Sequence, residues 1–271
     1  YPSRSSSIHI WNIADIHYGS AACDKDRFRA DVARVRDDPA SFWFGGGDYC
    51  DYISPSDKKR WDPRCIDPDI SVSDLGNLGM TQAKWIADAF RPIRHKCLGM
   101  LLGNHEEKYM RAKEQMDLHA WMCGELGVPN LGYAAIVNVR FRRKTGGIAL
   151  RPTYSGGGDG WEVRFALHHG FSAAATPGGK LNTLTRWMQA VEADVYMLGH
   201  VHDQMARKQP ILCCDRNCSK ITFRDRIGVI TGAYLKTYSK GVSTYGEQRG
   251  YAPVNLGAVR VTLVPYKKEL R

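Results

Sequence analysis

The chain has 271 residues, of which 43% are hydrophobic and 24% are charged, and its formal net charge is +10. This composition is typical of a folded globular protein and argues against an intrinsically disordered chain. No run approaches the roughly 20 consecutive apolar residues of a membrane helix, so we expect no membrane partner and a cytoplasmic location. The positive charge suits anionic partners such as phosphorylated small molecules or nucleic acid, and it is equally explained by solubility alone. Because the sequence begins at Tyr1 and not at methionine, we expect a missing upstream segment.

Hydrophobic periodicity predicts strands and helices that alternate along the first 203 residues. In chain order we predict a strand at 7–15, a helix at 24–38, a strand at 41–48, an irregular loop at 55–79, a helix at 81–90 capped by Thr81, a strand at 95–106, a helix at 106–126, a strand at 162–170, a helix at 180–193 and a strand at 194–203. From Ile211 onward, strands and turns alternate, and 257–265 is the clearest of these strands. The pattern predicts an α/β protein with a β-rich tail.

Two segments between these elements carry distinctive residues. The basic run RFRRK at 140–144 is expected on an exposed strand that leads into a hairpin, before a glycine-rich turn at 155–160. The cluster CCDRNC at 213–218 holds three of the eight cysteines. No second cysteine pair accompanies it, so we expect a lone disulfide or free thiols there and not a structural zinc site.

Every predicted strand in the first 203 residues ends in side chains that can bind a metal ion. These are Asp15 and His17 in DIH, Asp48 in GGD, Asn104 and His105 in GNH, His168 and His169 in HHG, and His200 and His202 in GHVH. Each cluster alone is also consistent with a turn or a hydrogen-bonded histidine. In α/β sheets ligands bind beyond the carboxyl ends of strands, so the five clusters should meet. Burying so many polar groups is costly unless they are paired or bound to metal, which predicts one convergent site.

The order D-x-H, GD, GNHE, HHG and GH-x-H over residues 8–203 resembles the calcineurin-like metallophosphoesterases. The stretches HHGFSAAATPGGKLN and GYAPVNLG are similar to the phage and bacterial branch of that superfamily. The resemblance implies a four-layer α-β-β-α sandwich with two mixed β-sheets. It also implies a single domain over residues 1–271, in which the β-rich tail, 211–271, completes the second sheet.

The resemblance further implies a centre with two divalent metal ions. Asp15, His17 and His202 would hold one ion, Asp48 would bridge, and Asn104, His200 and one histidine of His168/His169 would hold the other. The His-Gly pattern favours His169, whereas members that read His-His-Pro use the first histidine, so the choice stays open. The mixed donors favour Mn²⁺, with Fe, Zn²⁺ or Ni²⁺ as alternatives, over Mg²⁺ or Ca²⁺. Two ions about 3.5–4 Å apart can share an attacking hydroxide, with His105 assisting the leaving group.

Three residues beside these motifs are interpreted without a ligand role. Asp51 is expected to hydrogen-bond near the site or to face solvent. Glu106 is expected at the start of a helix, where the helix dipole favours a carboxylate. Asp203 is interpreted as a loop residue.

The expected function is hydrolysis of phosphodiester or phosphomonoester bonds, with a nucleotide or nucleic acid among the possible substrates. Ser/Thr phosphatases of this superfamily read GDxxDRG and RGNHE, whereas here Tyr52 follows Asp51 and Leu102 precedes Gly103. The loss of both arginines disfavours a protein phosphatase. A metal-dependent nuclease acting on DNA or RNA is the alternative. Tryptophans such as Trp43, Trp61 and Trp85 could stack on bases, but their positions favour a role as core or loop anchors. A non-catalytic binding scaffold is the remote alternative, and the intact His105 argues against it.

Overall fold

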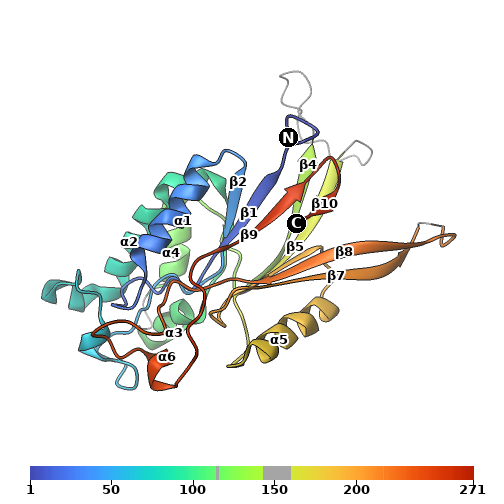
Figure 1. Ribbon diagram of the computed structural model, residues 1–271. Coiled ribbons are helices and arrows are strands. Elements are labelled where there is room, and N and C mark those ends of the chain that lie inside the picture. The colour runs from blue at the N-terminus through green and yellow to red at the C-terminus, as the bar shows by residue number, and fades with distance from the viewer. Residues whose placement is uncertain (114–115, 143–159, 216) are drawn as a thin grey trace.

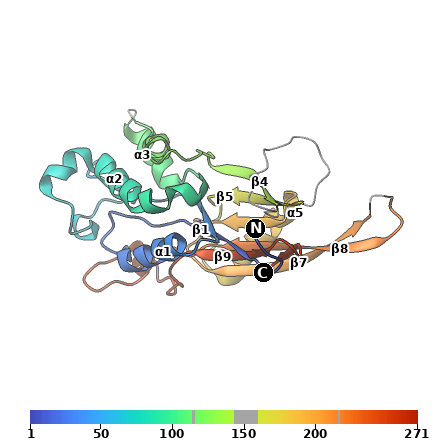
Figure 2. The same cartoon turned by 90° about the horizontal axis from the view of Figure 1, so that it is seen from above.

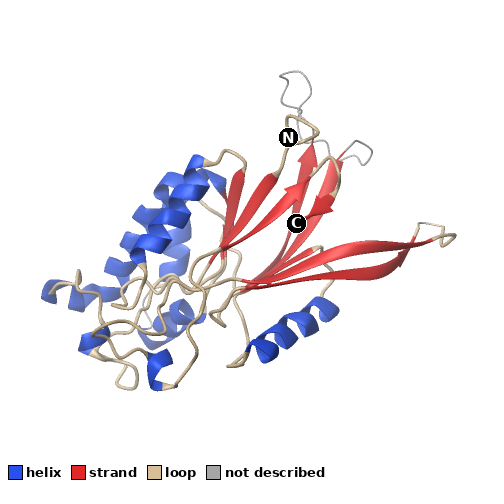
Figure 3. Cartoon of the chain, in the orientation of Figure 1, coloured by secondary structure: helices blue, strands red, loops and turns tan. Residues whose placement is uncertain are grey.

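Two five-stranded β-sheets pack face to face in the computed structural model, which describes residues 1–113, 116–142, 160–215 and 217–271. Helices lie on the outer side of each sheet (Figures 1 and 3). Among the described residues, no helix is long and apolar enough to cross a membrane.

The first sheet has the strand order β10 (Glu269–Leu270), β9 (Val259–Val264), β1 (Ile8–Ile13), β2 (Ser41–Gly45) and β3 (Cys97–Met100). Strands β1, β2 and β3 are parallel, and β9 pairs antiparallel with β1. The three parallel strands therefore end at the same edge of the sheet.

The second sheet has the order β4 (Ala134–Arg142), β5 (Gly160–His168), β6 (Val195–Leu198), β8 (Ile221–Ile230) and β7 (Met205–Cys214). Strands β5, β6 and β8 are parallel, whereas β4 and β7 pair antiparallel with their neighbours. The sheet is mixed, and the carboxyl ends of β5 and β6 lie next to each other.

The helices are α1 (Lys25–Asp37), α2 (Leu78–Phe90), α3 (Asn104–Lys113), α4 (Leu118–Leu126), α5 (Pro177–Ala190) and α6 (Tyr245–Gln248), with 3₁₀ turns at Pro63–Cys65, Val72–Asn77 and Arg91–Lys96. Helices α1, α2 and α4 lie on the side of the first sheet that faces away from the second, and α5 lies on the outer side of the second sheet (Figures 1 and 2). Helix α1 begins after Asp24, whose side chain accepts a hydrogen bond from the backbone N–H of Arg27.

Three apolar clusters separate four layers of structure. The first joins the first sheet to helices such as α1 and α2, with Trp43, Phe28 and Phe90 in contact. The second lies between the sheets, where Phe44 packs against Phe165. The third joins the second sheet to α5 through Tyr196 and neighbouring apolar residues. The order helix, sheet, sheet, helix confirms the predicted four-layer α/β sandwich.

The β-rich tail differs from its prediction, because it contributes to both sheets. Strands β7 and β8 belong to the second sheet, as expected for residues 211–271, but β9 and β10 pair with β1 in the first sheet. The register pairs Ile10 with Val261, and both side chains are buried in the cluster between the sheets. Burial of the apolar face of β9 against the second sheet is the physical reason for this placement.

Two helix boundaries also differ from their predictions. Helix α2 begins at Leu78 and not after Thr81, because the 3₁₀ turn at Val72–Asn77, held by a capping box between Ser71 and Asp74, leads directly into it. The helix expected at 106–126 is two helices, α3 and α4, and the Asp117 side chain caps the second by accepting from Ala120 N. Of the basic run at 140–144, residues 140–142 lie in β4. Residues 143–144, and the glycine-rich turn at 155–160 except Gly160, lie outside the described residues.

Candidate metal centre

Five loops that follow strands β1, β2, β3, β5 and β6 bring polar side chains to the shared edge of the two sheets. Five of the predicted site residues have backbones in the left-handed region, which non-glycine residues rarely adopt. They are Asp15 (φ 53°), His17 (φ 51°), Asp48 (φ 52°), His200 (φ 69°) and His202 (φ 48°). Such conformations persist where the surrounding structure enforces them, and they gather at functional sites.

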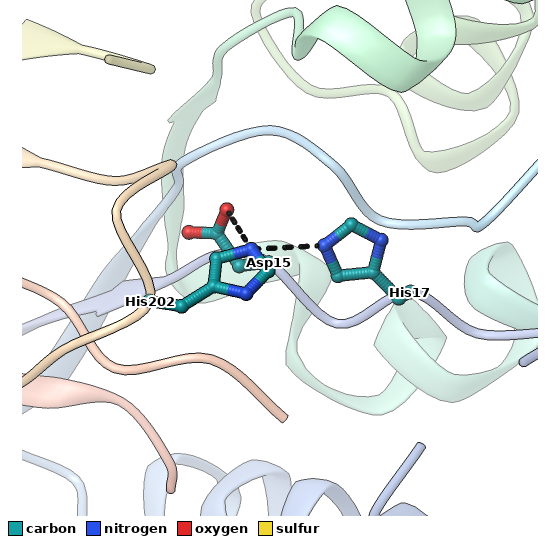
Figure 4. A group of neighbouring side chains, drawn as sticks. All are labelled: Asp15, His17 and His202. Carbon is teal, nitrogen blue, oxygen red and sulfur yellow. Dashed lines mark hydrogen bonds and ion pairs between the residues drawn. The ribbon is translucent and has the colours of Figure 1, made fainter. Parts of the chain in front are cut away.

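The first group of ligand atoms comes from the loops after β1 and β6 (Figure 4). Nε2 of His202 lies 3.3 Å from Asp15 Oδ1 and 3.1 Å from Nε2 of His17. The two imidazole rings therefore direct their Nε2 atoms at one small volume beside the Asp15 carboxylate. A carboxylate and two imidazoles that converge in this way can hold a divalent cation.

The second group comes from the loops after β2, β3, β5 and β6. One atom of the Asn104 side-chain amide lies 3.0 Å from His169 Nε2, 3.2 Å from Asp48 Oδ2 and 2.7 Å from His200 Nδ1. Nε2 of His169 also lies 3.3 Å from Asp48 Oδ2. Four potential ligand atoms therefore converge on one point, from four loops far apart in the sequence.

The two adjacent histidines after β5 have different surroundings. The His169 side chain is fully buried, and its Nδ1 donates a hydrogen bond to the carbonyl of Gly46 at 2.8 Å, which leaves Nε2 directed at the second group. His168 points away: its Nδ1 accepts from Gly170 N at 2.9 Å, and its ring packs against Trp187. The structure thus brings His169 to the second group and leaves His168 outside it.

His105, in the first turn of α3, lies between the two groups. Its backbone N–H donates to Asp48 Oδ1 at 2.8 Å, and its ring packs edge-on against His17 with centroids 4.6 Å apart. Ring nitrogen Nδ1 donates to the backbone carbonyl of Asp51 at 2.6 Å. Because Nδ1 is engaged, Nε2 is the ring nitrogen of His105 that remains for a substrate.

Asp51 and Asp203 support the site from outside. Oδ1 of Asp51 lies 3.4 Å from Nδ1 of His17, and carboxylate contacts of this kind orient histidine ligands. Asp203 is more than a loop residue, because its carboxylate pairs with Lys180 of α5 at 3.2 Å. This ion pair ties the loop that carries His202 to helix α5.

Glu106 is a residue whose structural role the sequence did not reveal. It lies in the first turn of α3, as predicted, but its buried carboxylate accepts backbone hydrogen bonds from Asp48 (2.9 Å), Tyr49 (2.8 Å) and Gly103 (3.0 Å). A Cβ atom at Gly103 would collide with Asp48 N and with the Glu106 carboxylate, which explains the glycine. The glycines that precede Asp48 were the available signal, because such a turn leaves N–H groups in need of an acceptor.

The pKa values of the buried groups reflect burial and the charges that lie close by. Burial alone would raise the pKa of the Asp48 carboxyl, but His169 and His105 hold it well below its usual range. Burial would lower the pKa of His169, yet Asp48 and Asp15 raise it to about 10. For Glu106, burial and then Asp48 raise the pKa to about 7. Without bound cations, the histidinium of His169 therefore offsets the charges of the carboxylates.

The donors present fit two divalent cations. Asp15 and Asp48 are buried, and within the described parts of the chain neither forms an ion pair with lysine or arginine. A buried carboxylate without such a partner is costly unless histidine or a metal ion compensates its charge. The facing Nε2 atoms of His17 and His202, 3.1 Å apart, can share one proton or bind one cation between them.

The family model described as calcineurin-like phosphoesterase matches residues 8–204. No curated protein sequence matches the chain significantly.

Solved structures with similar folds have low sequence identity to this chain. A Streptococcus pneumoniae protein described as a predicted phosphoesterase is 12% identical, with a TM-score of 0.36, over 95% of this chain and 84% of that one. Haemophilus influenzae NAD nucleotidase is 11% identical, with a TM-score of 0.41, over 96% of this chain and 48% of that one. Vps29 of Chaetomium thermophilum is 13% identical, with a TM-score of 0.34, over 94% and 97%. These values are too low to assign a shared activity.

Proposed function

The chain belongs to the calcineurin-like phosphoesterase family, and on this premise we propose that it is a dinuclear metal-dependent phosphohydrolase. One observation carries the proposal: two groups of ligand atoms meet at one sheet edge, with His105 between them. We assign Asp15, His17 and His202 to one ion and Asn104, His169 and His200 to the other, with Asp48 bridging. We assign no ligand role to His168.

When bound, the two ions would supply a nucleophilic oxygen at neutral pH and neutralise charge on the phosphoryl group, and Mn²⁺ is the metal that we propose. The protein groups then have separate tasks. Asp51 and Glu106 hold His17 and the Asp48 loop in place. His105, fixed through Nδ1, holds a proton at Nε2 and transfers it to the departing oxygen.

A hydrolysis assay tests the proposal. The metal-depleted chain, reconstituted with Mn²⁺, Zn²⁺ or Mg²⁺, is assayed with bis(p-nitrophenyl) phosphate, p-nitrophenyl phosphate and mononucleotides. We expect hydrolysis that depends on metal and a loss of about 10²–10⁴-fold in kcat for His105→Ala. Elemental analysis should still find both ions in this variant.

The exposed His95 provides the matched control, since it lies in the turn that precedes β3, whereas the site residues follow that strand, and His95→Ala should retain full activity. Full activity in His105→Ala, or a protein that takes up no metal, would contradict the proposal. Bound metal without turnover of any phosphate ester would instead favour the binding scaffold. Single- and double-stranded DNA in the same assay test the nuclease alternative.

A further inference from the structure

The hairpin formed by β7 and β8 projects away from the rest of the fold (Figures 1 and 2). Its tip carries Cys213, Cys214 and Cys218. The ladder pairs Cys213 with Thr222 and ends with Cys214 opposite Ile221. Because successive side chains of a strand point to opposite faces, Cys213 and Cys214 lie on different faces of the hairpin. Only Cys214 therefore shares a face with Leu212, Ile221 and Phe223, three exposed apolar residues.

The turn that closes the hairpin brings Cys218 back toward Cys214. The Cys218 backbone has a left-handed φ of 54°, and its N–H donates to the carbonyl of Asp215 at 3.0 Å. The Asp215 carboxylate fixes the far side of the turn by accepting from Ser219 N at 2.7 Å and Lys220 N at 2.9 Å. As a result, Sγ of Cys218 lies 3.4 Å from Sγ of Cys214.

The other cysteines are less suited to oxidation. Cys214 and Cys218 are the exposed cysteines, whereas Cys23, Cys50 and Cys123 are buried. Burial raises the pKa of the Cys23 and Cys123 thiols to about 12, which keeps them protonated. An oxidant in solution therefore reaches the tip thiols most readily.

We propose that Cys214 and Cys218 form a reversible disulfide, so that the hairpin tip is a thiol modification site. The oxidant is a small disulfide such as glutathione disulfide. One protein thiolate attacks it and releases one glutathione; the second protein thiolate then displaces the other, so that two protein thiols become one disulfide and two glutathione thiols form. The two Sγ atoms need to approach from 3.4 Å to about 2.05 Å, which side-chain rotation can supply.

Peptide mapping of the full chain tests this pairing. The reduced chain is equilibrated without oxygen in glutathione redox buffers, quenched with iodoacetamide and digested with trypsin. Cleavage after Lys208, Arg216 and Lys220 separates the two cysteines, so the disulfide should join the fragments 209–216 and 217–220. The link should appear in oxidising buffers and disappear in reducing ones.

Serine variants identify the bridged atoms. Cys213→Ser should keep the link, and Cys214→Ser and Cys218→Ser should each abolish it. Asp215→Ala should lower the equilibrium constant for oxidation about fivefold, because the turn loses side-chain hydrogen bonds that hold it closed. A link that survives in Cys214→Ser, a disulfide between two chains, or full alkylation of both cysteines in every buffer would each overturn the proposal. None of these outcomes depends on the metal centre.

Discussion

Glu106 offers the sharpest test of how the fold supports its site. The substitution Glu106→Ala removes the acceptor of four backbone N–H groups in the loops after β2 and β3, three at 2.8–3.0 Å and that of Cys50 at 3.4 Å. Those groups stay buried after the substitution. We therefore expect the loop that carries Asp48 to lose its fixed conformation, and the metal site with it.

The size of the effect follows from opposing contributions. The three shorter hydrogen bonds dominate this cost: a buried N–H group without an acceptor costs about 1–3 kcal/mol, so the three together cost roughly 6 kcal/mol. In the wild type, burial beside Asp48 raises the pKa of the Glu106 carboxyl from 4.5 to about 7, so the charged carboxylate destabilises the fold by about 3 kcal/mol above pH 7. The substitution to alanine removes this cost and so offsets about half of the loss from the broken hydrogen bonds. The net loss in unfolding free energy is therefore about 3 kcal/mol. Glu106→Gln keeps one acceptor oxygen and should lose less.

Urea denaturation of the metal-free proteins measures this loss. A raised carboxyl pKa means that the folded state binds the proton more tightly, so this group makes the wild type less stable as pH rises from about 4.5 to 7. Glu106→Gln should lack this contribution, so its free energy of unfolding should fall less over that window. A single hydrogen bond contributes about 1 kcal/mol. If the free energy of unfolding of Glu106→Ala lay within about 0.5 kcal/mol of the wild-type value, and its Mn²⁺ affinity were unchanged, the reasoning would be refuted.

Three further outcomes follow from the second group of ligands. His169→Ala should reduce the bound metal from two ions to one by elemental analysis, whereas His168→Ala should keep both; equal metal content in the two variants would contradict the assignment. Mn²⁺ should displace a proton from His169, whose pKa is about 10 without metal. Calorimetry in two buffers should therefore show proton release, and for each proton released the Mn²⁺ affinity should rise about tenfold per pH unit from pH 7 to 9. An affinity independent of pH would argue against this exchange. Saturating metal at 100 times its Kd should stabilise the fold by about 2.7 kcal/mol, and a chelator should reverse the rise in Tm.

The sequence allowed much of the fold to be predicted, because the signals involved are local. Apolar runs such as 41–48 predict buried strands, and the polar residue after each strand predicts where the strands end. The placement of β9 beside β1 is a different kind of information. It depends on pairing between residues more than 200 positions apart, and a short apolar run does not specify which strand it will pair with.

The site was predictable in its residue types and not in its contacts. The motifs indicated that Asp15, Asp48 and His200 should meet, and the structure brings them to one edge. The choice between His168 and His169 depends on which face of β5 turns toward the other sheet, and this cannot be read from adjacent identical side chains. The role of Glu106 as an acceptor of backbone hydrogen bonds was not predicted, because a carboxylate in the first turn of a helix is already explained by the helix dipole.

The left-handed backbones of Asp15, His17, Asp48, His200 and His202 set metal binding against thermal robustness. Each such residue costs about 1 kcal/mol relative to glycine, which adopts this conformation freely. Glycine at these positions would relieve that strain, but at Asp15 and Asp48 it would also leave the backbone N–H groups of His200 and His105 without their acceptors. Directed evolution for heat resistance without added metal should therefore replace His202 sooner than Asp15 or Asp48, and the same selection with metal present should preserve all three.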